Sequence, residues 1–192
     1  VARKLPAPSQ EIVAISLWEF LDANKYCAAI NLGPLTPKQK ELVRTGLPYP
    51  QWYRLSHESE RLSLSMVKPL LDKYGWLRSH VRIGTRRRFH DLPADLPVTE
   101  DFCKFIGLYI AEGHATDGYL IVSNSEPDVV EWLHMYCANL GVGIKTRPHT
   151  YDHVIYSKIL SDVMKHLCGK LAHTKQLPAW WPQLSGQKLA AL

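Results

Sequence analysis

The second half of the chain has the more regular pattern of hydrophobic and polar positions. Apolar residues recur every three or four positions where a helix is expected, and every second position where a strand is expected. The spacing predicts three helices, at residues 99 to 111, 126 to 139 and 159 to 167. It predicts three strands, at residues 119 to 123, 142 to 148 and 153 to 157, with a turn at 149 to 152. Helices and strands in this order predict an α+β fold.

Residues at the ends of these segments agree with the predicted helices. Thr99 can cap the first helix, and Pro127 can occupy the first turn of the second. Gly141 and Gly169 follow the second and third helices, where a helix commonly ends.

The first half of the chain is less regular. Helical spacing occurs at residues 11 to 21, 37 to 45 and 63 to 71, whereas residues 46 to 50 predict a loop and residues 76 to 83 alternate like a strand. A helix, a glycine turn and a strand indicate a mainly helical region with a winged-helix-like unit. An ordinary helical linker domain fits the same pattern, and the proline at position 69 would kink the third helix.

A change of composition near residues 92 to 99 predicts a domain boundary, because two prolines there interrupt any helix. We therefore expect a mainly helical, basic region at residues 1 to 95 and an α+β domain at residues 96 to 192.

Composition indicates a chain with a substantial core. Its 192 residues are 46% hydrophobic, but no apolar run approaches the roughly 20 residues that span a membrane. The first residues lack the hydrophobic stretch of a signal peptide, so we expect an intracellular location, in the cytoplasm or nucleoid, and no secretion. The cysteines form no close pair and predict buried free thiols rather than a zinc ribbon or disulfides. They are Cys27, Cys103, Cys137 and Cys168.

The net charge of +5 is concentrated in the first hundred residues, which hold 15 Lys and Arg against 10 Asp and Glu. The remaining residues hold 8 of each kind. Guanidinium groups suit phosphate oxygens through forked hydrogen bonds, so the arginine cluster is a candidate DNA contact. A solvated basic surface is the alternative. The cluster consists of Arg78, Arg82, Arg86, Arg87 and Arg88.

Residues 105 to 113 carry the strongest functional signal, Phe-Ile-Gly-Leu-Tyr-Ile-Ala-Glu-Gly. Gly107 and Ala111 lie four positions apart, so they share a helix face where a second backbone can approach closely. Glu112 then stands at the end of that face. This segment resembles the LAGLIDADG motif of homing endonucleases and inteins, in its glutamate variant.

The resemblance continues in order along residues 96 to 192. The segments at 96 to 100, 154 to 160 and 174 to 181 resemble the lead-in, the strand-to-helix step and the lysine-containing block of intein endonucleases. Residues 184 to 192 resemble the approach to a second motif, but the sequence stops before a second acid. The resemblance therefore implies the N-terminal region and first half of an endonuclease. No splicing residues are recognised, so self-splicing is not expected.

The family resemblance implies a Mg²⁺-dependent DNA endonuclease. Glu112 would bind the metal through its carboxylate, and Ala111 would add its backbone carbonyl. Lys175 corresponds to the family's basic residue near the scissile phosphate. Since the family uses two acids, the partners would be double-stranded DNA and either a second LAGLIDADG half or an identical subunit. The expected reaction is double-strand cleavage, and the one acid of this chain would supply at most half of the site.

The predicted strands and their turn supply candidate DNA contacts, because alternate side chains of a strand face the same way. An ordinary solvent-exposed hairpin is the alternative. The spacing of His149 and His153 would suit a metal only on a helix, so zinc is not expected there. The candidate contacts are Lys145, Arg147, His149, Tyr151, His153 and Lys158.

Three other functions remain open. A catalytically inactive LAGLIDADG-fold protein could bind DNA as a regulator, and an RNA-binding intron maturase would use the same basic surface. The balanced charge after residue 100 also fits a metabolic or interaction domain with no nucleic-acid role.

Overall fold

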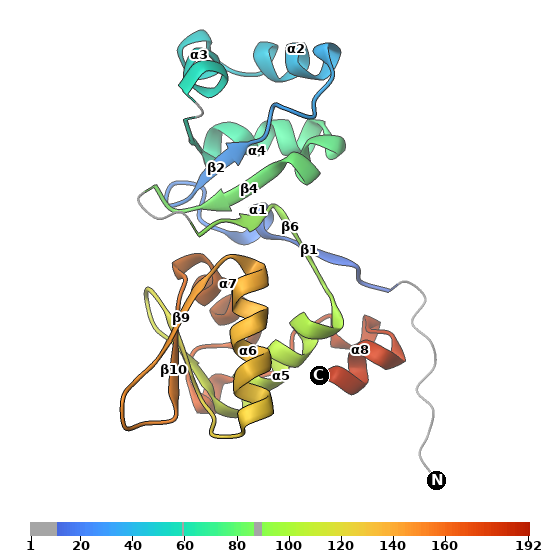
Figure 1. The fold of residues 1–192 in the computed structure, drawn as a ribbon. Helices are drawn as coiled ribbons and strands as arrows, with labels where there is room; N and C mark the ends of the chain where they lie inside the picture. The colour runs from blue at the N-terminus through green and yellow to red at the C-terminus, as the bar shows by residue number, and fades with distance from the viewer. Residues whose placement is uncertain (1–10, 59, 87–89) are drawn as a thin grey trace. The chain divides into compact units, whose positions relative to one another are not determined.

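The computed structural model describes residues 11–58, 60–86 and 90–192, and the chain divides into two compact units (Figure 1). Unit 1 comprises Val1–Ile15 and Pro97–Leu192, and unit 2 comprises Ser16–Leu96. Both contain helices and antiparallel strands, so the prediction of an α+β chain is confirmed. No helix in the described ranges is long and apolar enough to cross a membrane.

Unit 1 consists of a four-stranded sheet and its helices. The helices are α5 (Glu100–Glu112), α6 (Pro127–Leu140), α7 (Lys158–Cys168) and α8 (Gly186–Ala191), with short 3₁₀ turns at Ala172–Thr174 and Trp181–Gln183. The strands are β7 (Gly113–Ala115), β8 (Leu120–Ser123), β9 (Gly143–Thr146) and β10 (Asp152–Tyr156). They pair in the order β7-β8-β10-β9, and every neighbouring pair is antiparallel.

The helices of unit 1 begin and end where the local signals predict. The hydroxyl of Thr99 accepts a hydrogen bond from the Phe102 N–H at 3.1 Å and caps α5. Pro127 opens α6, and Gly141 ends it in the left-handed conformation with φ of 73°. Two elements were not predicted, the three-residue strand β7 and helix α8, because both are too short to show a period.

The register of the sheet fixes which side chains share a face, since directly paired residues point the same way. His153 pairs with Val122 and Thr146, whereas Val154 pairs with Ile121 and Lys145. The first row therefore lies on one face and the second on the other. We call the face that carries His114, Lys145 and Tyr156 the polar face; Ile121 and Val154, at its centre, are buried.

Unit 2 contains more strand than the sequence indicated. Its helices are α1 (Leu17–Phe20), α2 (Pro37–Thr45), α3 (Tyr49–Glu58) and α4 (Leu64–Lys73), with a 3₁₀ helix η1 at Gly75–His80. A sheet of order β3-β2-β4-β5 is built from β2 (Cys27–Ile30), β3 (Leu62–Ser63), β4 (Val81–Gly84) and β5 (Leu92–Pro93). The prediction of a mainly helical region therefore understates the sheet, whose short strands carry little periodic signal.

Three local predictions in this part of the chain were wrong. Residues 11 to 21 do not form one helix: strand β1 (Ala14–Ser16) pairs with β6 (Asp95–Pro97), and only α1 is helical. The expected strand at 76 to 83 begins at Val81, after η1. The expected loop at 46 to 50 is shortened because α3 starts at Tyr49. Pairing with the distant strand β6 decided the first outcome, and it is invisible in a local pattern. Local hydrogen bonds of η1, such as that from the Leu77 N–H to the Tyr74 carbonyl at 2.9 Å, decided the second.

The chain passes from unit 2 to unit 1 after Leu96, next to the predicted boundary, but residues 11 to 15 belong to unit 1. The Ile12 N–H donates to the carbonyl of Gln183 at 3.2 Å. Glu11 forms an ion pair with Lys188 at 2.8 Å. These contacts explain why the start of the described chain packs with the second half, and they correct its assignment to a region of residues 1 to 95.

Candidate functional site

Glu112 is the last residue of α5, and its side chain is exposed. Its side-chain hydrogen bond is long and weak, because the Asn124 side-chain amide lies 3.4 Å from the Glu112 Oε2 atom. An acid is electrostatically unfavourable at the C-terminal end of a helix, where the backbone carbonyls already concentrate negative charge. The carboxylate therefore stands in a place that favours a bound cation.

Lys175 supplies positive charge at the same helix end. Its ammonium donates a hydrogen bond to the carbonyl of Ile110 at 2.9 Å and lies 5.2 Å from the centre of the Tyr109 ring. Ile110 is in the last turn of α5, where carbonyls lack helical partners. Burial lowers the pKa of Lys175 below its usual value, while Cys168 acts in the opposite direction. The interaction is a helix cap as well as a candidate catalytic arrangement.

Tyr109 holds the segment that carries Lys175. Its hydroxyl donates to the carbonyl of Gly169 at 2.7 Å, and its ring is fully buried. Gly169 has φ of 87°, and a β-carbon there would lie 2.3 Å from the carbonyl oxygen of Thr174. The tight turn before Lys175 therefore requires a glycine.

The two small residues of the motif differ in their surroundings. A β-carbon at Gly107 would lie 2.0 Å from the backbone oxygen of Leu192, just beyond α8, so the two backbones approach closely at this point. Ala111 is exposed. Of the two predicted packing residues, Gly107 therefore lies against a second backbone, whereas Ala111 faces solvent.

His153 is not available for direct contact with DNA. It is only 3% exposed, and both ring nitrogens have partners: Nδ1 is 3.0 Å from the Thr146 hydroxyl, and Nε2 is 3.1 Å from the Asn124 carbonyl. Because a carbonyl can only accept, Nε2 is the protonated nitrogen. The ring also packs edge-on against the ring of His134 on α6, with the two ring centres 5.6 Å apart. The prediction failed because His153 lies on the sheet face opposite Lys145.

The same histidine connects the sheet to the acid. Its Nε2–H donates to the backbone of Asn124, whose side chain in turn reaches Glu112. Asn124 also accepts a hydrogen bond from the Glu126 N–H at 2.9 Å, at the start of α6. Asn124 was not predicted as a site residue, since no local pattern shows that it lies beside an acid twelve positions earlier.

Other predicted DNA contacts lie on or beside the polar face. Lys145 and Arg147 are exposed and two positions apart, and His149 and Tyr151 lie in the exposed turn that follows. Arg147 is 3.4 Å from the Asp152 carboxylate, a partly exposed pair that contributes little stability. The ring centres of Tyr119 and Tyr156 are 6.4 Å apart, which adds aromatic surface beside these residues.

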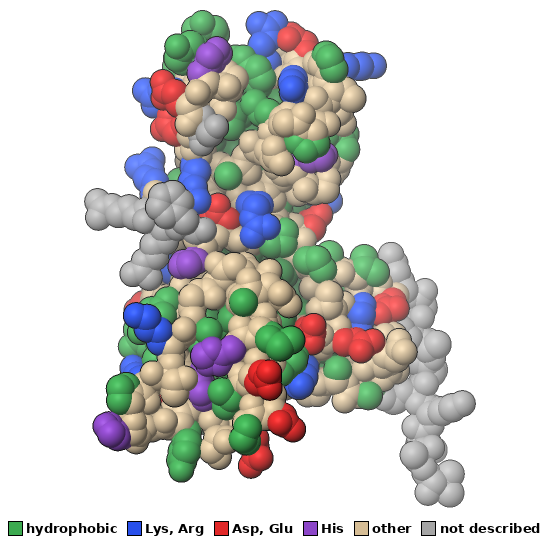
Figure 2. All heavy atoms as spheres, viewed as in Figure 1, with side chains coloured by type: hydrophobic (Ala, Val, Ile, Leu, Met, Phe, Trp, Pro, Cys, Tyr) green, Lys and Arg blue, Asp and Glu red, His purple; other side chains and the backbone are tan. Residues whose placement is uncertain are grey.

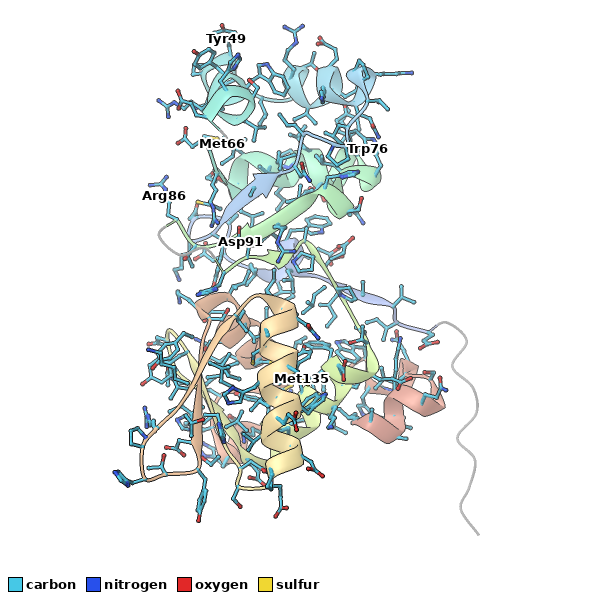
Figure 3. The ribbon with its side chains drawn as sticks, viewed as in Figure 1. Tyr49, Met66, Trp76, Arg86, Asp91 and Met135 are labelled. Atoms are coloured by element: carbon cyan, nitrogen blue, oxygen red, sulfur yellow. The ribbon has the colours of Figure 1, made fainter. Side chains whose placement is uncertain are left out.

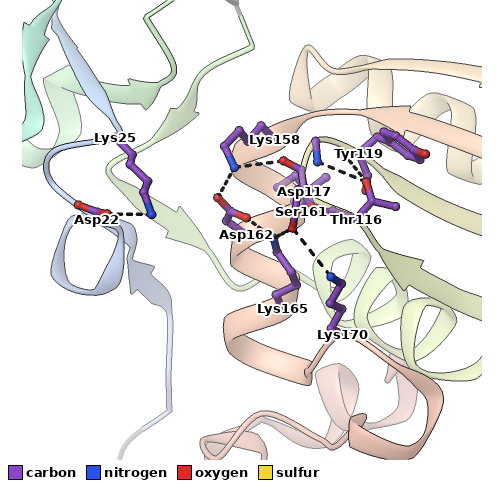
Figure 4. A network of polar contacts seen from close by, with 12 residues as sticks. Asp22, Lys25, Thr116, Asp117, Tyr119, Lys158, Ser161, Asp162, Lys165 and Lys170 are labelled. Carbon is purple, nitrogen blue, oxygen red and sulfur yellow. Dashed lines mark hydrogen bonds and ion pairs between the residues drawn. The ribbon is translucent and has the colours of Figure 1, made fainter.

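Lys158 lies in a network of charges rather than standing free (Figure 4). Its ammonium is 3.1 Å from both the Asp162 carboxylate and the Asp117 carbonyl. Lys165 binds the other oxygen of Asp162 at 2.5 Å. A DNA phosphate would therefore compete with internal partners for Lys158.

The arginines predicted to form one cluster have different surroundings. Arg78 donates to the carbonyl of Leu71 at 3.2 Å and lies 4.8 Å from the Trp18 ring, so it packs within unit 2. Arg82 donates to the carbonyl of Asp91, whereas Arg86 is exposed. Arg87 and Arg88 lie outside the described residues.

The residues at the end of α5 fit a magnesium ion in part. Mg²⁺ prefers oxygen ligands and commonly binds one or two carboxylates together with water and substrate phosphates. The Glu112 carboxylate and the Ala111 carbonyl, one of the helix-end acceptors, are oxygen donors of that kind. Within residues 11–58, 60–86 and 90–192, no three His, Cys, Asp or Glu side chains gather as a metal cluster.

No protein-family model matches this sequence, and no curated protein is significantly similar to it.

Proposed function

We propose that this chain is part of a LAGLIDADG-type endonuclease that cleaves double-stranded DNA, with its catalytic residues at the end of α5. One observation carries the proposal: Glu112 is the exposed last residue of α5, and the Lys175 ammonium binds the Ile110 carbonyl in the last turn of the same helix. Another backbone approaches this helix closely at Gly107. The resemblance of residues 105 to 113 to the family motif supports it.

The proposed chemistry is hydrolysis of a phosphodiester. The oxygen of a water molecule attacks phosphorus, the bond to the 3′-oxygen breaks, and a proton passes to the departing oxygen. Glu112 and the Ala111 carbonyl would hold Mg²⁺, which supplies charge neutralisation and an activated water. Lys175, fixed at 2.9 Å from the Ile110 carbonyl, would add positive charge beside the phosphate.

Cutting both strands needs a second acid. A second LAGLIDADG half or an identical subunit would supply it and would place a second carboxylate beside Glu112. The polar face would lie against the duplex, with Lys145 and Arg147 as phosphate and base-edge contacts. His149 and Tyr151 would extend this surface, whereas His153 supports it from within.

The test begins with selection of bound duplexes from a randomised library at about 0.15 M salt, since affinity depends strongly on salt. Cleavage of the selected site in Mg²⁺ is then compared for the wild type, Glu112→Gln and Glu131→Gln, an exposed control on α6. We expect only Glu112→Gln to slow cleavage, by about 10²- to 10³-fold, because metal stabilisation contributes several kcal/mol and 1.4 kcal/mol is about tenfold.

Three results would contradict the proposal in distinct ways. Undiminished cleavage by Glu112→Gln would remove the catalytic assignment. Specific binding without metal-dependent cleavage, with a second half present, would indicate a DNA-binding regulator. Tighter binding of structured RNA than of duplex DNA at fixed salt would indicate a maturase.

A further inference from the structure

A small cavity of about 110 Å³ lies in unit 2 among α3, the start of α4 and the end of β4. Figure 3 shows Arg86 and Met66 on the same side of this unit, and Figure 2 shows several Lys and Arg side chains there. We call it the arginine cavity. Its walls include Gln51, Arg54, Glu60, Arg61, Met66 and Arg86.

Arg61 is a neutralised and fixed part of the wall. Two of its nitrogens bind the two oxygens of Asp91 at 2.8 Å, and its side chain is 20% exposed. Gly84 makes room for this pair, because a β-carbon there would overlap the Asp91 carboxylate. Forked pairing of this kind leaves the guanidinium little freedom to bind anything else.

Arg54 has a much weaker partner. Its Nε atom is 3.5 Å from the Glu60 carboxylate, and both side chains are about half exposed. Such a pair contributes little, because solvent screens the charges. Arg54 can therefore turn toward a new anion at small cost.

Two further polar groups of the wall, the Arg86 guanidinium and the Gln51 Oε1 atom, form no hydrogen bond or ion pair with a residue in the described part of the chain. Arg86 is exposed, with no ion pair or hydrogen bond to a described residue. The Oε1 atom of Gln51 is buried and lacks a hydrogen bond among the same residues. Burying an unsatisfied amide atom costs about 1–3 kcal/mol, so the cavity holds one uncompensated cation and one polar group in need of a partner.

We propose that the arginine cavity binds a backbone phosphate of a nucleic acid. Arg86 would donate a forked pair of hydrogen bonds to two phosphate oxygens. A half-turn of the Gln51 amide presents its Nε2 donor in place of Oε1, and Arg54 would close the third side. A volume near 110 Å³ has room for a single phosphate group. The excess of 15 basic over 10 acidic residues in the first hundred favours a polyanionic ligand.

This inference rests on the proposed function for the identity of the ligand, but the site itself is independent of Glu112. Duplex binding by the full chain is measured by fluorescence anisotropy between about 0.05 and 0.3 M salt. The variants are Arg86→Gln and Lys38→Gln, which remove the same charge; Lys38 is exposed on α2 and does not line the cavity. In parallel, NMR follows the Gln51 side-chain amide during titration with the duplex and with inorganic phosphate alone.

Loss of one phosphate contact reduces the steepness of the plot of log affinity against log salt by about 0.9. Over a tenfold range of salt, the variant's affinity therefore falls about eightfold less than that of the wild type. We expect this change in Arg86→Gln, less than about a twofold change in Lys38→Gln, and a shift of the Gln51 amide with the duplex. Equal losses in the two variants, no loss in Arg86→Gln, or an unmoved Gln51 amide would overturn the inference. A response to inorganic phosphate but not to the duplex would overturn the nucleic-acid assignment.

The two proposals fail separately. If the wild type cleaves its site and Arg86→Gln binds it equally well, only the cavity assignment is wrong. If binding depends on Arg86 but Glu112→Gln still cleaves, only the catalytic assignment is wrong.

Discussion

The hydroxyl of Tyr109 provides a direct test of how the segment before Lys175 is held. Tyr109→Phe keeps the ring, which is fully buried, and removes the 2.7 Å hydrogen bond to the Gly169 carbonyl. A lost hydrogen bond costs about 0.5–1.5 kcal/mol, and Gly169 is only partly buried, so water can reach the carbonyl that loses its donor. In a chain of this size each kcal/mol corresponds to about 2–4 °C in melting temperature.

Urea unfolding of the full chain measures this loss, and Tyr136→Phe is the matched control. Tyr136 is also buried in unit 1, but its hydroxyl has no recorded hydrogen bond to a described residue. We expect the control to change the free energy of unfolding by less than about 0.5 kcal/mol.

Amide exchange gives the local measurement. The Gln176 N–H donates to the Cys168 carbonyl at 3.0 Å, across the turn that Tyr109 supports. Its exchange should accelerate in Tyr109→Phe and remain unchanged in Tyr136→Phe. If Tyr109→Phe unfolds like the wild type and Gln176 stays equally protected, Tyr109 does not hold the Lys175 segment.

Three further predictions concern stability. Gly169→Ala should cost at least about 1–2 kcal/mol because it combines a positive φ with a close backbone contact, whereas Gly118→Ala, with open space around it, should cost less than about 0.5 kcal/mol; thermal unfolding compares them. Burial raises the pKa of Tyr109 from 10 to about 12, so the folded state holds the hydroxyl proton to a higher pH than the unfolded state does. The resulting contribution to the free energy of unfolding is complete below pH 10 and is lost as the pH rises through 12. Tyr109→Phe should lack this pH dependence in alkaline unfolding. Burial raises the pKa of Cys137 and Cys168 to about 12, so both thiols should react with a thiol reagent only at the rate of opening, and fast labelling of native protein would contradict this.

Helices α5, α6 and α7 could be predicted because their signals are local. Thr99 and Gly141 stand at their ends in the sequence as they do in the structure, and the buried free cysteines also followed from spacing. Strand β1 could not be predicted, because residues 14–16 pair with the distant strand β6. Helix η1 was missed because the alternation of residues 76 to 83 resembles a strand, although residues 75–80 form a 3₁₀ helix with local hydrogen bonds.

The candidate site was predictable only where the motif itself lies. Glu112 and Lys175 are recognisable in the sequence. In the structure Glu112 is the last residue of α5, and the Lys175 ammonium binds the carbonyl of Ile110 in the last turn of that helix. The inward position of His153 depends on strand register, and the place of Asn124 depends on a loop, so neither can be read from neighbouring residues. The same holds for the arginine cavity, whose walls come from segments up to thirty-five positions apart.

The alternation along β9 and β10 separates two kinds of sequence constraint. His153 and Ile155 are fixed by the buried interior, whereas Lys145 and Tyr156 lie on the opposite face and at least partly in solvent. Val154 and Ile121 on the same face as Lys145 are buried, so the freedom to change belongs to the exposed positions of the polar face. Substitutions at those positions can accumulate without disturbing the buried residues. A protein built in this way can change the ligand it selects over evolutionary time while its folded scaffold stays the same.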